Sequence, residues 1–314
     1  MESIDFSTFH PANIPSIWLW SIFGIIVFTM LFLDLFVFHR HSTEPKVSST
    51  LKICLSYMTI ALLFGVFVIY SRGFETGMLY YTGYLVEFSL SMDNIFVISL
   101  IFTSLQIPSK YQHRVLFWGV VGAIVLRAVM ILLGASLISN FHWILYIFSV
   151  FLIYTGVKML VHKEDDAPLT ESKLFKFVEK KFHVTKEIHG EHFFVKKGKK
   201  TYITPLFFAL IIVELMDVIF AVDSIPAIFL ITQDLFVIYT SNIFAILGLR
   251  SLYFLLAAAI SRFVYLKPAL AIILIFIGSK IFLPYIGLHP EAWMSLTITF
   301  GIIVAGIVIS LLKT

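Results

Sequence analysis

The stretch at residues 213–232, VELMDVIFAVDSIPAIFLIT, is long and apolar enough to cross a lipid bilayer, yet it carries three carboxylic acids. A charged side chain at the centre of a membrane helix costs about 2.5–3.5 kcal/mol on insertion scales, so it normally faces a cavity or a partner charge. Glu214 and Asp217 share one helix face, whereas Asp223 points about 240° away from Asp217. Structural ion pairs between helices are the alternative, but three acids on one span exceed what packing needs. We therefore expect a polar site inside the membrane.

Pro226 lies three residues after Asp223 in the same stretch. Proline has no N–H, so it leaves the carbonyl of Val222 without its helical donor. The sequence therefore predicts a broken helix, with freed carbonyls beside Asp223 and Ser224. Half-unwound helices at membrane depth are how many transporters build cation sites.

The composition indicates a polytopic helical membrane protein. Hydrophobic residues make up 59% of the 314, and charged residues only 13%. The formal charge of +4 arises mostly from basic residues in the loops between the spans. The single cysteine, Cys54, excludes an internal disulfide, a thiolate zinc site and an iron–sulfur cluster. The N-terminal segment is acidic and lacks the basic region of a cleavable signal, so the first apolar run is expected to stay as a span.

Hydropathy predicts an all-α fold of about nine transmembrane helices. Basic residues in the connections set the orientation. With the N-terminus outside, eighteen lysines and arginines fall on the inner side and only Arg72 on the outer side. We therefore predict an N-out, C-in topology. The expected spans are 16–38, 51–70, 77–105, 115–138, 141–161, 203–232 (broken), 234–260, 268–286 and 293–312.

The sequence divides into transmembrane helices at 1–161, a cytoplasmic basic loop at 162–200 and further transmembrane helices at 201–314. Within and beside the loop, an amphipathic surface helix is expected at 174–182 and a hairpin turning at Gly198 within 192–204. The simplest interpretation of the lysines in the loop is that they set the membrane topology and lie near anionic lipid. Solvated side chains are favoured over a regulatory metal site for its four histidines, His162, His183, His189 and His192.

Two parts of the chain repeat each other. The pentapeptide MDNIF at 92–96 matches MDVIF at 216–220, an offset of 124. The unit contains three helices, an odd number, so the second copy should enter the membrane from the opposite side. The apolar composition of both segments explains why they share hydrophobic residues, but it does not explain why charged residues match at the same positions. We therefore predict an inverted repeat of 77–161 and 203–286. Charged landmarks recur at offsets of 124, 123 and 122: Asp93 and Asp217, Arg127 and Arg250, Lys158 and Lys280.

The predicted spans contain more acids than bases. Two negative charges remain in excess, which one divalent cation or two protons would balance. Arg127 and Arg250 are expected to be counter-ions of the carboxylates; unpaired, they would instead suit an oxyanion. Lys158 and Lys280 are expected to snorkel towards the helix ends. The embedded acids are Asp34, Glu87, Asp93, Glu214, Asp217 and Asp223.

No histidine or cysteine lies near the acidic clusters, so a nitrogen or sulfur cage of the zinc or copper type is not expected. The remaining candidates form a hard oxygen set that suits Mg²⁺, Ca²⁺ or Mn²⁺. A minority idea is that the thioethers of Met92 and Met216 favour Mn²⁺, although methionine is usually a packing residue. Besides the carboxylates, the oxygen donors are Asn94, Ser89, Ser91, Ser224 and Asn242.

The stretches VEFSLSMDNIFVISLIF (86–102) and VELMDVIFAVDSIPAIFLIT (213–232) resemble the two signatures of the TerC/Alx family of bacterial integral membrane proteins. The resemblance covers most of the chain and implies a manganese exporter of the bacterial inner membrane, with links to tellurium resistance. It places the metal-binding residues at Glu87, Asp93, Asn94, Glu214, Asp217, Asp223 and Ser224. The supporting residues that we add from the sequence are Asp34, Arg127, Arg250, Asn242 and Pro226.

Our functional hypothesis is a secondary transporter that exports Mn²⁺ through a site between the third and sixth spans, in exchange for protons. Ca²⁺ and Mg²⁺ are the alternative ions, and the lipid bilayer is the other partner. No tightly bound cofactor, nucleic-acid partner or enzymatic activity is expected, because no P-loop and no nucleophile–base set is present. Two alternatives stay open: a membrane scaffold that binds proteins through 162–200, and a tellurite-type oxyanion transporter that uses the two arginines.

Overall fold

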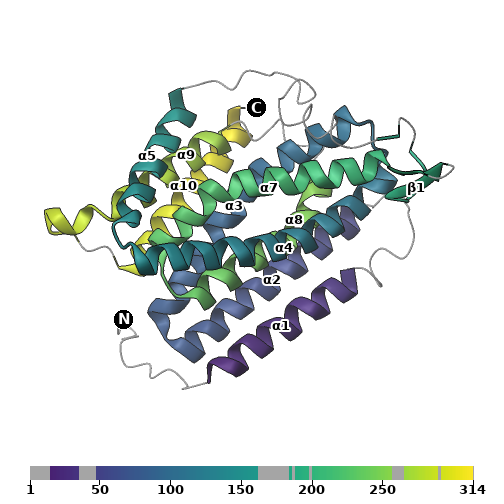
Figure 1. The fold of residues 1–314 in the computed structure, drawn as a ribbon. Helices are drawn as coiled ribbons and strands as arrows, with labels where there is room; N and C mark the ends of the chain where they lie inside the picture. The colour runs from purple at the N-terminus through teal and green to yellow at the C-terminus, as the bar shows by residue number, and fades with distance from the viewer. Residues whose placement is uncertain are drawn as a thin grey trace.

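The computed structural model describes residues 15–34, 47–161, 184–185, 188–197, 200–256, 265–288 and 291–313, although a few side chains within these ranges, including those of Asp93 and Arg250, are not described. The described part is a bundle of long helices with one small hairpin (Figure 1). The helices are α1 (Ser16–Leu33), α2 (Val47–Arg72), α3 (Phe74–Ser104), α4 (Ser109–Asn140), α5 (Ile144–Val161), α7 (Pro205–Ile231), α8 (Leu235–Leu256), α9 (Leu266–Lys280), α10 (Ala292–Lys313) and the short 3₁₀ helix η5 (Leu283–Ile286).

These long helices, nine within the described residues, correspond one to one with the predicted spans, which confirms the all-α membrane fold. Seven of them are long and apolar enough to cross a bilayer by composition alone. The other two are α3, whose middle carries Glu87 and Asn94, and α9, described over 15 residues. Large apolar side chains are exposed on the outer faces, as a lipid-facing surface requires; examples are Phe28, Leu133, Tyr154 and Leu312.

The predicted break at Pro226 is wrong. Helix α7 runs without interruption from Pro205 to Ile231, with Pro226 inside it. A proline removes one helical hydrogen bond, but its fixed φ near −65° suits a helix, and neighbouring helices in a membrane bundle can hold the segment in place. Ile225, Pro226 and Ala227 are all buried, so packing on both sides of the missing bond keeps the helix continuous.

The helices pack in a pattern that agrees with the predicted repeat. Helix α3 packs on α8, and α7 packs on α4, which is the same contact with the two copies exchanged. Helix α5 packs on α9, its own counterpart. Helices α2 and α10 pack against this assembly, and α1 lies at its outer edge against α8 (Figure 1).

Two glycines show the symmetry of the α5–α9 contact in detail. A Cβ added to Gly156 would lie 2.6 Å from the carbonyl oxygen of Ala271, and one added to Gly278 would lie 2.8 Å from the carbonyl oxygen of Ser149. An offset of 122 converts the first contact into the second. The partner's number falls as the residue number rises, so the two helices are antiparallel. This reciprocity supports an inverted repeat.

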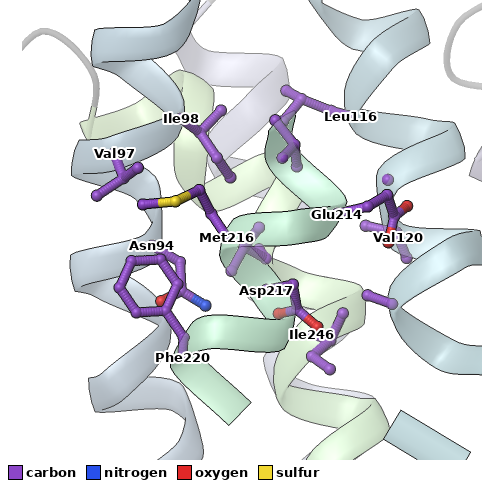
Figure 2. A pocket seen from close by; sticks show the side chains of 14 residues that line it. Asn94, Val97, Ile98, Leu116, Val120, Glu214, Met216, Asp217, Phe220 and Ile246 are labelled. Atoms are coloured by element: carbon purple, nitrogen blue, oxygen red, sulfur yellow. The ribbon is translucent and has the colours of Figure 1, made fainter. Parts of the chain in front are cut away.

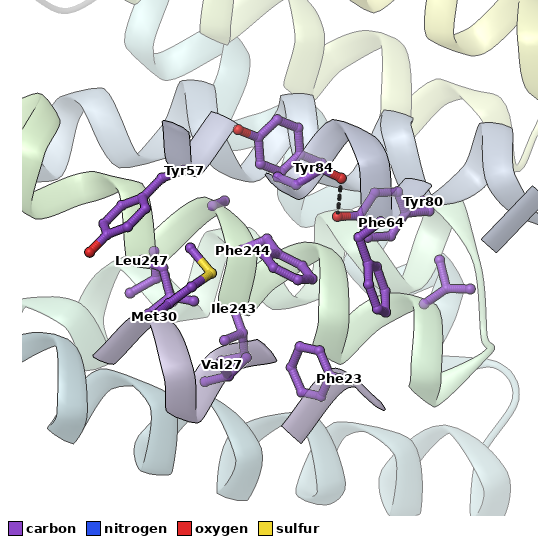
Figure 3. Close-up of a cluster of buried hydrophobic side chains, with 14 of the residues drawn as sticks. Phe23, Val27, Met30, Tyr57, Phe64, Tyr80, Tyr84, Ile243, Phe244 and Leu247 are labelled. Atoms are coloured by element: carbon purple, nitrogen blue, oxygen red, sulfur yellow. Dashed lines mark hydrogen bonds between the residues drawn. The ribbon is translucent and has the colours of Figure 1, made fainter. Parts of the chain in front are cut away.

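An aromatic cluster fills the space between α1, α2, α3 and α8 (Figure 3). Phe64 lies at its centre, with ring centroids 4.8 Å from Phe244, 5.7 Å from Tyr80 and 6.0 Å from Phe23. Tyr80 is fully buried and donates a hydrogen bond of 3.0 Å to the carbonyl oxygen of Ala61. One face of α3 and of α8 is therefore closed by packed rings.

The predicted hairpin is confirmed. Strands β1 (Phe194–Lys197) and β2 (Lys200–Ile203) are antiparallel, and Lys197 pairs with Lys200. Gly198, at which the turn was predicted, lies outside the described residues. The predicted helix at 174–182 lies outside the described residues, as do His162 and His183. No group of three or more potential metal ligands occurs in the part of the chain that is described.

Candidate functional site: an arginine between two cavities

Arg127 of α4 lies at the centre of the bundle with only 1% of its side chain exposed. Its Nη1 donates to Glu87 Oε1 of α3 at 2.6 Å, to Ser224 Oγ of α7 at 2.9 Å and to Asn242 Oδ1 of α8 at 3.2 Å. Its Nε and Nη2 donate to the two oxygens of Asp217 of α7 at 3.3 and 3.1 Å. One guanidinium thus joins four helices.

Glu87 is bonded through both oxygens, because Asn242 Nδ2 donates to its Oε2 at 2.9 Å. Asp217 accepts the arginine in the two-pronged geometry that matches a carboxylate to a guanidinium. Buried charges are tolerated only when they are paired and hydrogen-bonded in this way. The prediction that Arg127 is a counter-ion of the carboxylates is therefore confirmed.

A small cavity of about 30 Å³ lies next to Asp217, between α3, α4, α7 and α8 (Figure 2). Among the described side chains, its polar lining consists of Asn94, Glu214 and Asp217, and Met216 and Phe220 also line it. About 10–15 Å³ is enough for one water-sized particle. The small cavity therefore has room for a single ion or water molecule.

A larger cavity of about 310 Å³ lies next to Glu87. Asp223 and Ser224 of α7 line it, together with Lys158 and Thr155 of α5. Thr155, Lys158 and Asp223 therefore border the same cavity. The larger cavity is thus lined by both signs of charge.

The two cavities lie on opposite sides of the arginine along the helices. The small cavity is lined by α3 and α7 residues such as Ile98 and Val213, and the larger cavity by Glu87 and Ser224. In the predicted orientation, the end that holds Ile98 and Val213 is cytoplasmic. The small cavity therefore lies on the predicted cytoplasmic side of Arg127.

Glu214 lies between the small cavity and a lipid-facing groove. The groove, about 600 Å³ and almost wholly apolar, runs between α4 and α7 past Trp118 and Val125. The carboxylate rests against Gly122, where any side chain would collide with it. Glu214 Oε2 is buried and has no hydrogen-bond partner among the described residues.

The structure brings most of the predicted site residues together. Glu87, Asp217, Ser224 and Asn242 contact Arg127 directly, and the other cavity-lining members are Asn94, Glu214 and Asp223. The side chains of Asp93 and Arg250 lie outside the described residues, so their roles stay predictions.

Some predicted residues lie apart from the site. Asp34 ends α1, which packs on α8, and Asp34 lines neither cavity. Ser89 lines neither cavity, and its hydroxyl donates to the Leu85 carbonyl at 2.7 Å. Pro226 is buried in α7 without lining either cavity.

Lys158 and Thr155 are additions from the structure. Lys158 lines the larger cavity together with Asp223, and its side chain is also exposed in the last turn of α5. The expectation that it snorkels towards the helix end therefore stays a prediction. The signal was present in the sequence: residues three apart share a helix face, and Thr155 precedes Lys158 by three. What the sequence did not supply was that this face of α5 turns towards Asp223.

Fold and site together define a multi-pass integral membrane protein with a buried charge network at the crossing of two repeated helices. The chain matches the model of the integral membrane protein TerC family over residues 72–314 and belongs to that family. The family expected from the sequence motifs is thereby confirmed.

Relatives match over nearly their whole length. An uncharacterized membrane protein of Rickettsia bellii (strain RML369-C) is 49% identical over 294 residues, 94% of this chain and 97% of the relative. A membrane protein of Myxococcus xanthus is 44% identical over 98% of this chain and 95% of its own. The putative membrane-bound redox modulator Alx of Escherichia coli (strain K12) is 44% identical over 93% of this chain and 94% of its own. No solved structure matches the chain.

Proposed function

We propose that this protein is a secondary transporter of the bacterial inner membrane that exports a divalent metal cation, foremost Mn²⁺, from the cytoplasm in exchange for protons. It acts without chemical conversion of a substrate and without a resident cofactor. The observation that carries the proposal is the charge balance around Arg127. Among the residues whose side chains the structure describes, four carboxylates and two cations, Arg127 and Lys158, line the two cavities.

That balance leaves two negative charges inside the membrane when all the groups are ionised. One divalent cation, or two protons, neutralises them, and the same carboxylates can therefore trade one for the other. The oxygen donors near Asp217 are those that hard divalent cations prefer. Met216, which also lines the small cavity, adds a thioether next to these oxygens, a softer donor than Mg²⁺ or Ca²⁺ favours.

The oxyanion alternative is less well supported. An arginine that binds an oxyanion needs free donors, and those of Arg127 already serve two carboxylates, a hydroxyl and an amide. The scaffold alternative rests on the loop at 162–200, most of which lies outside the described residues.

The name of the Escherichia coli relative refers to redox modulation. This chain has one cysteine, Cys54, which is buried, so a single copy has no thiol pair to cycle. Control of the cytoplasmic level of a redox-active ion such as Mn²⁺ would link transport to redox state without any thiol chemistry.

The test is Mn²⁺ flux in liposomes that contain the purified protein, with and without an imposed pH gradient. The variant Asp217→Asn removes one charge from the network and keeps its shape, and we expect it to abolish flux. Glu75→Gln is the matched control, because Glu75 lies in the first turn of α3 and lines neither cavity. Full flux in folded Asp217→Asn would refute the proposal.

A further inference from the structure

Arg127 stands where the two cavities would join. Its carboxylate partners face different cavities, because Asp217 lines the small one and Glu87 the larger one. Asn94 and Phe220 line both cavities, so only this short layer of side chains separates them. The guanidinium donates hydrogen bonds to both carboxylates at 2.6–3.3 Å and thereby keeps the two cavities separate.

Asp217 and Glu87 are also two of the four carboxylates that line the cavities among the described residues. Both oxygens of Asp217 and one of Glu87 accept hydrogen bonds from Arg127. A metal ion and a guanidinium cannot occupy the same lone pairs at coordination distance, since each needs direct contact with the oxygen. In this conformation the arginine fills the place of a cation.

We propose that Arg127 is a tethered competitor of the transported ion: a divalent cation binds Asp217 only by displacing the guanidinium, and this displacement opens the passage between the two cavities. The inference rests on the proposed cation transport and identifies the group that controls it. With Arg127 bound, the two carboxylates of Glu87 and Asp217 keep a net charge of −1. A divalent cation in place of the guanidinium neutralises both.

The larger cavity provides a place for the displaced side chain. Arg127 already lines it, and its volume of about 310 Å³ accommodates a guanidinium without moving a helix. Asp223 lines the same cavity and offers a new counter-ion. The small cavity offers the incoming ion a position beside Asp217 on the predicted cytoplasmic side. Arrival of the ion and departure of the arginine are thus coupled through one carboxylate.

The experiment measures Mn²⁺ binding to the purified protein by the loss of the electron paramagnetic resonance signal of free Mn²⁺. Arg127→Gln removes the competitor but leaves two buried carboxylates without their cation, so a second substitution is introduced to protect folding. The double variant Glu87→Gln/Arg127→Gln removes one charge of each sign, and Glu87→Gln alone is its matched reference. We expect the double variant to bind Mn²⁺ about tenfold more tightly than Glu87→Gln, and to lose flux.

A gain in affinity separates a competitor from a structural residue, because loss of a structural residue weakens binding. Equal or weaker Mn²⁺ binding by the folded double variant would overturn the inference. Failure of the proposed function looks different: the wild-type protein would then show no Mn²⁺ flux in liposomes. Wild-type flux together with unchanged affinity in the double variant would refute the tethered competitor alone.

Discussion

Helices α3 and α8 each present two contrasting faces. Towards α1 and α2 they form the aromatic cluster around Phe64 and Phe244, where rings fill the space. Towards α4 and α7 they carry Glu87 and Asn242, where charged groups adjoin two cavities. Close-packed interiors resist rearrangement, whereas a charge network next to empty space has alternative pairings. The comparison suggests a fixed half and a moving half that share two helices.

Breaking the charge network should have the largest effect. Glu87→Leu leaves Arg127 with one carboxylate and removes the acceptor of Asn242. Loss of one partner of a buried ion pair costs about 3–5 kcal/mol. We expect a lower thermal midpoint of the purified protein in detergent and loss of Mn²⁺ flux. If Glu87→Leu keeps both wild-type stability and flux, the network has no role in the moving half.

Breaking the aromatic cluster should affect stability and spare transport. Phe64→Ala removes a ring that contacts Phe23, Tyr80 and Phe244. In soluble cores such truncations cost about 3–5 kcal/mol, but the hydrophobic part of that cost is absent between helices in lipid, so we expect about half of it or less. The measurements are the thermal midpoint and the flux per folded protein. Loss of Mn²⁺ flux in a fully folded Phe64→Ala variant would contradict the division into a fixed and a moving half.

The α5–α9 contact tests the symmetry between the repeats. Gly156→Ala and Gly278→Ala each force a methyl group against a backbone carbonyl, and overpacking costs about 1–3 kcal/mol. Because the two contacts are related by the repeat, we expect similar decreases in the thermal midpoint. Gly301→Ala is the control, since nothing lies within 4 Å of its added Cβ. A large effect at one glycine and none at the other would show that the symmetry does not extend to energetics.

The sequence predicted the helices, the hairpin and the counter-ion role of Arg127, because apolar length and unusual buried charge are local properties. Asp217 and Arg127 stood out for this reason, and a role of Arg127 as a counter-ion of carboxylates followed from the cost of a buried unpaired charge. Which carboxylates it contacts did not follow. The continuity of α7 at Pro226 did not follow, because it depends on packing around the missing hydrogen bond.

The two cavities also lay beyond the sequence. Which face of α5 turns inwards is set by contacts with α7 and α9, so the position of Lys158 beside Asp223 required the tertiary structure. The same holds for Glu214, which the sequence grouped with Asp217 on one helix face. The structure shows that Glu214 lies apart from the arginine, between the small cavity and the lipid-facing groove.

This separation leads to the smallest expected effect on stability. Glu214→Gln alters a carboxylate whose Oε2 has no hydrogen-bond partner among the described residues, so no pair is broken. We expect the free energy of unfolding to change by less than about 1 kcal/mol, in contrast to Glu87→Leu. Flux should still fall, because the small cavity loses one of the two carboxylates that line it among the described residues. Wild-type Mn²⁺ flux in Glu214→Gln would limit the ion's path to Asp217 and exclude Glu214 from it.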